Sequence, residues 1–185
     1  MQLIFKEHQI KLSEPDKLIH SMSELIGDQY IYNYMKVDGT VVYDDPIEFF
    51  KNNQEALSDI EQIEIIALTG KEHVEGIAIE GSQYISNALP VLEEMSKSIY
   101  KDGIGSVKNK FISLSEGIQW LVSSLAVINE ITTNSRENEL TAKLQSALIE
   151  LNEGLENNDA VLVADIIEYE VVEIFQEIQK FFEEV

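Results

Sequence analysis

The sequence contains no cysteine and only three prolines and three histidines among its 185 residues. Without cysteine the chain has no disulfide, no thiolate zinc site and no cysteine nucleophile. No segment reaches the run of about 18 uninterrupted apolar residues that a membrane span needs. The first residues also lack the basic start and the apolar stretch of a signal peptide. We therefore expect a cytoplasmic protein that does not insert into membranes.

Positive charge is also scarce, because 13 Lys and Arg residues stand against 34 Asp and Glu residues, for a formal net charge of −21. Residues 1–69 carry 5 basic and 13 acidic residues (−8), and residues 70–185 carry 8 and 21 (−13). Such a surface repels phosphate backbones and anionic lipids, so we expect no binding to nucleic acid. The acidity serves solubility, which is the interpretation we favour, and the alternative is complementarity to a basic or transiently exposed partner.

The residues that carry catalysis or bind metals are few and scattered. None of the histidines, at positions 8, 20 and 73, follows a glutamate by three positions, as the Glu-x-x-His pairs of di-metal bundles require. The glycine-rich stretch Gly103-Ile104-Gly105-Ser106 follows no predicted strand and lacks a phosphate-binding lysine. We predict no catalytic residue, no cofactor and no metal site, and therefore a non-enzymatic protein.

The spacing of hydrophobic residues changes once, near Thr69-Gly70. Before this point apolar residues alternate in short runs, which is typical of half-buried strands. After it they recur every three or four residues, which is typical of packed helices. The sequence therefore predicts an α+β fold with a small α+β module at residues 1–69 and an acidic helical bundle at residues 70–185.

The first half predicts strands at 3–6, 10–12, 30–37, 40–43 and 60–68, with a helix at 14–26 and a shorter one near 46–50. A tight turn is expected at His8-Gln9. Asp38-Gly39 between β-forming residues is a strong hairpin signal. Ser13 is the expected N-cap of the first helix, with Pro15 in its first turn.

This order of elements resembles the ubiquitin-like β-grasp fold over residues 1–69. The resemblance implies a mixed sheet wrapped around the helix at 14–26. Conjugation and sulfur-carrier roles in that family need a free Gly-Gly end, whereas here the last strand continues as Thr69-Gly70-Lys71. The resemblance therefore implies a binding or scaffold role.

Three tyrosines, Tyr30, Tyr32 and Tyr34, alternate along one predicted strand and are expected on one face of it. They could form an aromatic face for a partner, because tyrosine is enriched in interface cores. The alternative, which we favour, is a β-forming surface partly covered by the second domain.

The second half predicts four helices, near residues 71–101, 104–131, 140–155 and 160–185, with a kink at Pro90. From Ile104 to Ile128 the apolar spacing alternates between three and four, as in a coiled-coil seam. Short connections between the helices favour an antiparallel four-helix bundle.

The last two helices are strongly acidic, since residues 137–185 contain 13 acidic and 2 basic residues. Tyr169, Phe175 and Phe182 lie off the main apolar seam and are candidate anchors for a partner. The alternative, which we favour, is a second packing face inside the bundle. Acidic side chains three positions apart, at 165 and 168 and at 170 and 173, are expected to be solvated.

The stretch LENNDAVLVADIIEYE at residues 155–170, within 148–172, resembles the C-terminal hairpin of small bacterial helical-bundle proteins and is similar in general form to flagellar export chaperones. Those chaperones bind the amphipathic helical ends of secreted subunits. The resemblance therefore implies a protein–protein interaction or chaperone-like function, with a basic amphipathic helix as the expected partner. The alternatives are a structural homodimer, and an enzyme with carboxylates and tyrosines in a cleft between the halves.

Overall fold

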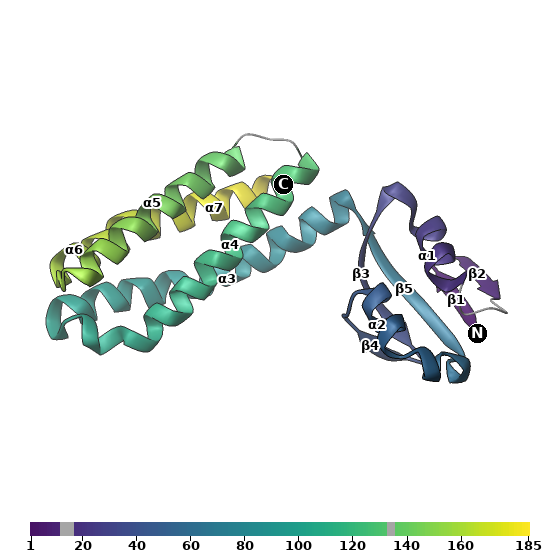
Figure 1. Ribbon diagram of the computed structural model, residues 1–185. Coiled ribbons are helices and arrows are strands. Elements are labelled where there is room, and N and C mark those ends of the chain that lie inside the picture. Colours follow the sequence, from purple (N-terminus) through teal and green to yellow (C-terminus); the bar gives the residue numbers. More distant parts are fainter. Residues whose placement is uncertain (12–16, 133–135) are drawn as a thin grey trace. The chain divides into compact units, whose positions relative to one another are not determined.

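The computed structural model describes residues 1–11, 17–132 and 136–185 (Figure 1). The fold is α+β, as predicted. The chain divides into two compact units, Met1–His73 and Val74–Val185. The change of hydrophobic spacing at Thr69-Gly70 thus lies inside the first unit, close to its end. The predicted N-cap Ser13 and Pro15 lie outside the described residues.

The first unit contains a five-stranded mixed sheet formed by β1 (Gln2–Phe5), β2 (His8–Lys11), β3 (Tyr30–Val37), β4 (Thr40–Val42) and β5 (Gln62–Thr69), in the order β2-β1-β5-β3-β4. β1 and β5 are parallel and the other pairs are antiparallel. Helix α1 (Leu18–Ile26) packs against β1 and β3. The unit also contains η2 (Gly27–Gln29), α2 (Pro46–Asn52) and η3 (Gln54–Asp59). Its core includes Leu3, Phe5, Leu18, Met22, Met35, Phe50, Ile63 and Ile65.

The hairpin predicted at Asp38-Gly39 is confirmed, because these two residues connect β3 and β4 with φ angles of +48° and +84°. Positive φ at both positions is the signature of a type I′ turn. The predicted turn at His8-Gln9 is wrong: β1 and β2 are joined at Lys6-Glu7, and His8 pairs with Phe5. The two-residue loop sets Leu3 opposite Ile10, which the alternation of apolar residues alone did not determine.

Strand β3 contains a β-bulge at Asn33. Tyr32 pairs with Ala67 of β5 while Tyr34 pairs with the adjacent Ile66, so Asn33 has no partner in this register. An extra residue reverses the alternation of side chains between the two faces. Tyr30 and Tyr32 therefore pack on the core face, and Tyr34 lies on the opposite one. The prediction that all three share a face is wrong because period-two spacing assumes an unbroken strand.

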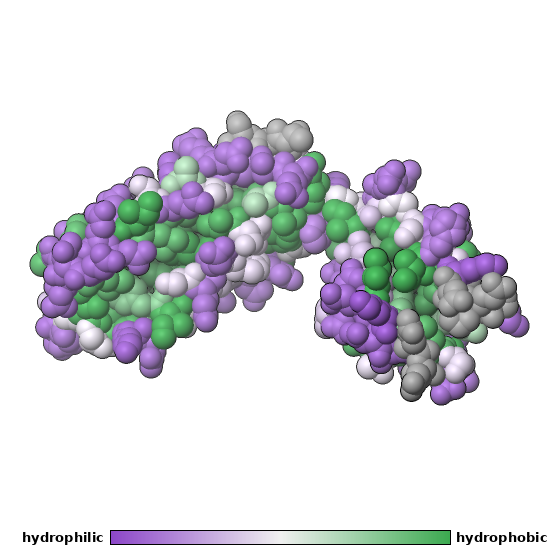
Figure 2. Space-filling view, viewed as in Figure 1, coloured by the Kyte–Doolittle hydropathy of each residue, from purple (hydrophilic) through white to green (hydrophobic). Residues whose placement is uncertain are grey.

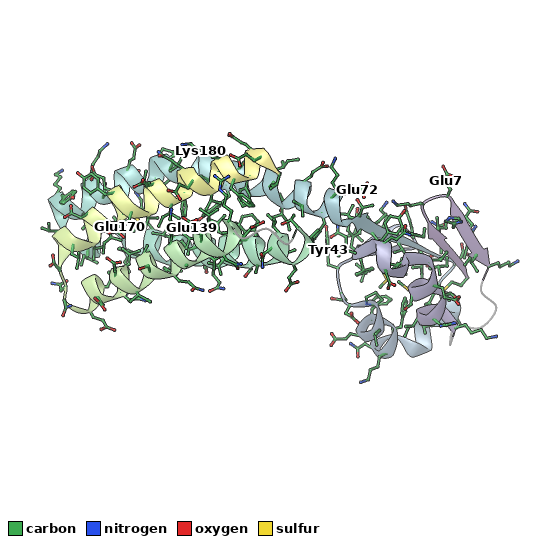
Figure 3. The ribbon with its side chains drawn as sticks, turned by 90° about the horizontal axis from the view of Figure 1, so that it is seen from above. Glu7, Tyr43, Glu72, Glu139, Glu170 and Lys180 are labelled. Atoms are coloured by element: carbon green, nitrogen blue, oxygen red, sulfur yellow. The ribbon has the colours of Figure 1, made fainter. Side chains whose placement is uncertain are left out.

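Helix α3 (Gly70–Asp102) begins directly after β5, and a capping box stabilises its first turn. The backbone N–H and the hydroxyl of Thr69 donate to Oε2 of Glu72 over 2.7 and 2.9 Å, and the backbone N–H of Glu72 donates back to the Thr69 hydroxyl. This reciprocal pattern satisfies backbone donors that a helix start leaves open. The hydrogen bonds from the backbone and the hydroxyl of Thr69 lower the pKa of the Glu72 carboxyl. Glu72 is labelled in Figure 3.

The second unit consists of most of α3 followed by η4 (Ile104–Val107), α4 (Lys108–Thr132), α5 (Arg136–Glu156), α6 (Ala160–Asp165), the π-helical η5 (Ile166–Val171) and α7 (Val172–Glu184). Helix α3 continues through Pro90 and ends before Gly103, whose φ is +80°. Helix α5 packs against α4, α6, η5 and α7. The helices share one hydrophobic core that includes Ile85, Met95, Ile118, Leu121, Leu125, Leu144, Ile167 and Phe175.

The segment Ile104–Thr132, which joins η4 and α4, is long and apolar enough to cross a membrane by length and composition alone. The central helix of a globular core passes the same test. Here Ile118, Leu121, Leu125 and Ile128 are all inaccessible to solvent, within the core of the unit. Only 39% of the apolar window of this segment is buried, and Ile112 and Trp120 are 55% and 37% exposed, so burial accounts for part of its apolar character.

Candidate functional site

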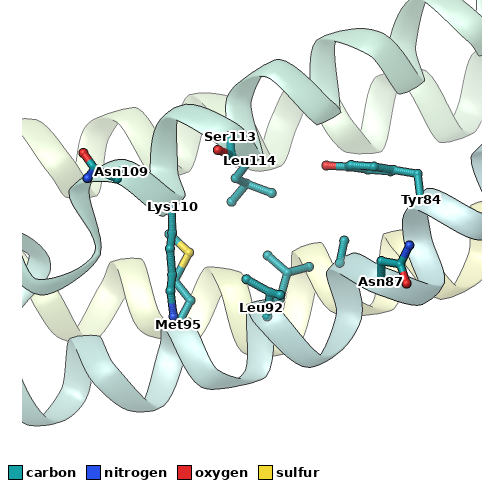
Figure 4. Close-up of a pocket in the computed structure, with 10 residues that line it drawn as sticks. Tyr84, Asn87, Leu92, Met95, Asn109, Lys110, Ser113 and Leu114 are labelled. Atoms are coloured by element: carbon teal, nitrogen blue, oxygen red, sulfur yellow. The ribbon is translucent and has the colours of Figure 1, made fainter.

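An apolar groove lies between α3 and α4 (Figure 4) and encloses about 400 Å³. Figure 2 shows hydrophobic surface on the visible face of the helical unit, bordered by hydrophilic side chains. Apolar side chains make up most of the groove wall, and polar side chains stand among them. The lining consists of Tyr84, Asn87, Ala88, Val91, Leu92 and Met95 from α3, and Asn109, Lys110, Ser113 and Leu114 from α4.

The size of the side chains along the two helices explains the groove. Leu92, Met95 and Leu114 are buried and belong to the core, while Ala88 and Ser113 are small. Val91 lies at the groove with 42% of its surface exposed. Because dispersion and desolvation favour filling such a space, an apolar side chain from a ligand would gain about 1.5–3 kcal/mol there.

Tyr84 reaches across from α3 toward α4 at one end of the groove (Figure 4). Its ring occupies the space that Gly117 leaves on α4, where an added Cβ would overlap the Tyr84 hydroxyl. The ring also packs against Trp120 and Phe175, with centroids 5.9 and 6.3 Å away. Burial raises the pKa of the Tyr84 hydroxyl. The wall at this end is therefore aromatic and fixed by packing.

Lys110 and Glu94 join the two helices at the other end. Nζ of Lys110, on α4, lies 3.2 Å from Oε2 of Glu94, on α3. Figure 4 shows the Lys110 side chain extending toward α3 beside Met95. The groove therefore has an aromatic end and a charged end.

The match with a family covers this groove completely. The family described as "Domain of unknown function (DUF8042)" matches residues 77–181, which is more than half of the chain. The chain belongs to the DUF8042 family. No curated protein and no solved structure matches the chain. Both walls of the groove, from Tyr84 to Leu114, fall within the DUF8042 region.

Two predicted partner anchors of the helical unit are not available to a partner. Phe175 and Phe182 are buried in the core, with exposed fractions of 0% and 4%. Their surfaces are covered by α3, since Phe175 packs on Tyr84, and Phe182 lies where Gly81 has no side chain. The prediction of exposed anchors is wrong for these two, and the favoured alternative of a packing face is confirmed. Tyr169 is 64% exposed but does not line the groove.

The tyrosines of β3 have separate packing partners. Tyr30 meets the edge of Phe5 with centroids 5.2 Å apart, and the ammonium of Lys6 lies 4.0 Å from its ring centroid. Tyr32 donates its hydroxyl to the carbonyl of Asp44, and burial, followed by the nearby acidic residues, raises its pKa. Tyr34 packs on Tyr43, 5.5 Å between centroids. The three therefore do not form one aromatic binding face.

Acidic side chains of the last helices are engaged in part. Asp165 accepts a hydrogen bond from the hydroxyl of Tyr100, which raises the pKa of Tyr100 to about 12. Asp165 was predicted to be solvated, but its carboxylate is paired with the Tyr100 hydroxyl. Burial and the neighbouring Glu150 raise the pKa of Glu170, which Figure 3 labels. Within residues 1–11, 17–132 and 136–185, no group of three or more histidine, aspartate or glutamate side chains is placed to hold a metal ion.

Sequence reasoning did not find the groove. The helix predicted near 71–101 contains Tyr84, Ala88, Val91 and Met95, but no groove was predicted beside it. The sequence feature that points to the groove is the run of small residues on α4, Ser113 and Gly117, opposite the large Tyr84. Recognising it requires the pairing of α3 with α4, which a single sequence does not provide.

Proposed function

We propose that the helical unit binds an amphipathic helix of a partner protein in the groove between α3 and α4. The observation that carries this proposal is the groove itself, whose lining is mostly apolar and comes from the neighbouring helices α3 and α4. A helix laid on such a surface contributes apolar side chains at spacings of three and four residues. Two such side chains buried in the groove would provide several kcal/mol of gross binding free energy.

Charge favours a basic helix as the occupant. The unit Val74–Val185 carries 20 acidic and 7 basic residues, a formal net charge of −13. A field of this sign raises the association rate of a basic segment and repels an acidic one. Because Lys143 is bound by both Glu139 and Glu177, one of these few cations is already neutralised. The proposed role is therefore chaperone-like, as in the export chaperones that the sequence resembles.

Two architectural proposals accompany this function. The strand order β2-β1-β5-β3-β4, with α1 on the sheet, supports a β-grasp fold for the first unit. In the second unit, a common core of α3, α4, α5 and the α6-η5-α7 segment supports an antiparallel four-helix bundle. The groove would then lie between two neighbouring helices of the bundle.

The proposal is tested with a synthetic amphipathic peptide of leucine and lysine in a helical repeat, titrated into the full chain by calorimetry. Ala88→Leu fills the groove with the protein's own side chain while keeping a helix-forming residue. Ala126→Leu is the matched control, because Ala126 is an exposed alanine of α4 outside the groove. We expect Ala88→Leu to weaken binding about tenfold or more, equivalent to about 1.4 kcal/mol, and Ala126→Leu to leave it unchanged.

If Ala88→Leu and Ala126→Leu bind the peptide equally well, the groove is not the binding site. Light scattering of the unliganded protein tests the homodimer alternative. A dimer that dissociates in the Ala88→Leu variant would mean that a second copy of the chain, rather than a partner helix, occupies the groove.

A further inference from the structure

Lys110 covers the charged end of the groove. Its aliphatic stem lines the groove beside Met95, and its ammonium lies 3.2 Å from the Glu94 carboxylate on the facing helix. Lysine side chains commonly lay their methylene stem on apolar surface while the charge stays in water. The ammonium of Lys110 thus lies beside Glu94 where a basic side chain of a bound helix would otherwise lie.

The ion pair that holds Lys110 is exposed. Of the two side chains, Lys110 is 36% accessible and Glu94 is 69% accessible. Water and salt screen the attraction between such groups. An exposed ion pair of this kind is worth a factor of about 1.5 to 5 in an equilibrium constant. A bound ligand that supplies its own cation can therefore displace Lys110 at little cost.

Resting on the proposed function, we infer that Lys110 and Glu94 form a displaceable clasp over the groove, and that the partner helix carries a lysine or arginine that replaces Lys110 on Glu94. When Lys110 moves aside, Glu94 is left as an uncompensated carboxylate at the edge of an apolar surface. A basic side chain restores the pairing, whereas an acidic one repels Glu94. Glu94 is thereby the residue that selects the charge of the bound helix.

The clasp is tested by calorimetry with the leucine–lysine peptide and a leucine–glutamate counterpart at physiological ionic strength. Lys110→Met keeps an unbranched apolar side chain but removes the ammonium, so Glu94 is free for the ligand. We expect the leucine–lysine peptide to bind about two- to fivefold more tightly to this variant, with no gain for the leucine–glutamate peptide. Glu94→Gln is expected to reduce the preference for the basic peptide.

Lys108→Met is the matched control. Lys108 is an exposed lysine on the same helix that does not line the groove, and its replacement changes the net charge by the same amount. If Lys108→Met and Lys110→Met raise affinity equally, only the overall charge matters and the clasp is refuted, while binding in the groove stands. If Lys110→Met weakens binding, the ammonium is part of the binding surface and the clasp is again refuted. Failure of Ala88→Leu to weaken binding refutes the proposed function instead.

Discussion

Two glycines of α3 provide a sharp test of how the helical unit is packed. A Cβ added at Gly81 would lie 2.7 Å from Cδ2 and 2.8 Å from Cζ of Phe182, and still closer to Cε2. A Cβ added at Gly76 would meet nothing within 4 Å. Both substitutions to alanine remove the same backbone freedom from one helix, so the difference between them measures packing against Phe182 alone.

The expected magnitudes have opposite signs. Gly76→Ala should stabilise the unit by about 0.5–1 kcal/mol through helix propensity. Gly81→Ala gains the same amount but overpacks a buried ring, which typically costs about 1–3 kcal/mol. Because Phe182 is only 4% exposed and its ring meets the new Cβ at three atoms, we expect the upper part of that range. The two variants should therefore differ by about 2–3 kcal/mol.

The assay is urea unfolding followed by the fluorescence of Trp120, the one tryptophan of the chain, which packs on Tyr84 within the same unit. A difference of 2 kcal/mol corresponds to a midpoint shift of about 1–2 M urea for a unit of this size. Phe182→Leu in the Gly81→Ala background should recover part of the loss, because a smaller side chain frees the space. Equal stability of the two alanine variants would refute the packing of α3 on α7 at this position.

Two further predictions concern the first unit. The pKa of Glu72 is lowered in the folded protein, so its ionised capping bonds stabilise the fold above its ordinary pKa of 4.5. This stabilisation is lost as the pH falls through the lowered pKa. The stabilities of the wild type and of Glu72→Gln should therefore differ at neutral pH and converge in acid. Circular dichroism of urea unfolding at both pH values measures this, and a constant difference would contradict it. Tyr32→Ala should cost about 2 kcal/mol or more and Tyr34→Ala about 1 kcal/mol or less, because only Tyr32 packs on the core. Similar losses in thermal unfolding of the two variants would contradict the bulge at Asn33.

Local signals in the sequence predicted the elements well where one residue type determines the backbone. Asp38-Gly39 predicted its turn because few residues adopt positive φ at two successive positions. The shorter helix predicted near 46–50 is α2, which begins at Pro46, and Oδ1 of Asp45 accepts hydrogen bonds from the N–H groups of Ile47 and Glu48. Thr69 and Glu72 also have the Thr-x-x-Glu spacing of a capping box, which is a local signal for a helix start.

Features that depend on the pairing of distant segments escaped prediction. The β-bulge at Asn33 follows from the register between β3 and β5. This register cannot be deduced from the sequence of β3 alone. The burial of Phe175 agrees with the favoured alternative, but its packing partner Tyr84 lies about ninety positions earlier in the chain and was not predicted. The groove itself depends on which faces of α3 and α4 are set against each other. In each case the deciding contact is tertiary, and alternation or heptad spacing along one segment carries no information about it.

The two edges of the sheet have a consequence for self-association. Strand β4 has three residues and β2 has four, and they are the outer strands on either side. Edge strands this short expose few unpaired backbone groups. Short edge strands are one way in which natural sheets prevent edge-to-edge growth. The long strands β3 and β5 are interior in this order, but β4 pairs only with 35–37 of β3 and β1 pairs only with 62–65 of β5. Among the described residues, 30–34 of β3 and 66–69 of β5 therefore have no strand paired on one side, so an extended polypeptide recognised by the first unit would pair with these two segments rather than with the short outer strands.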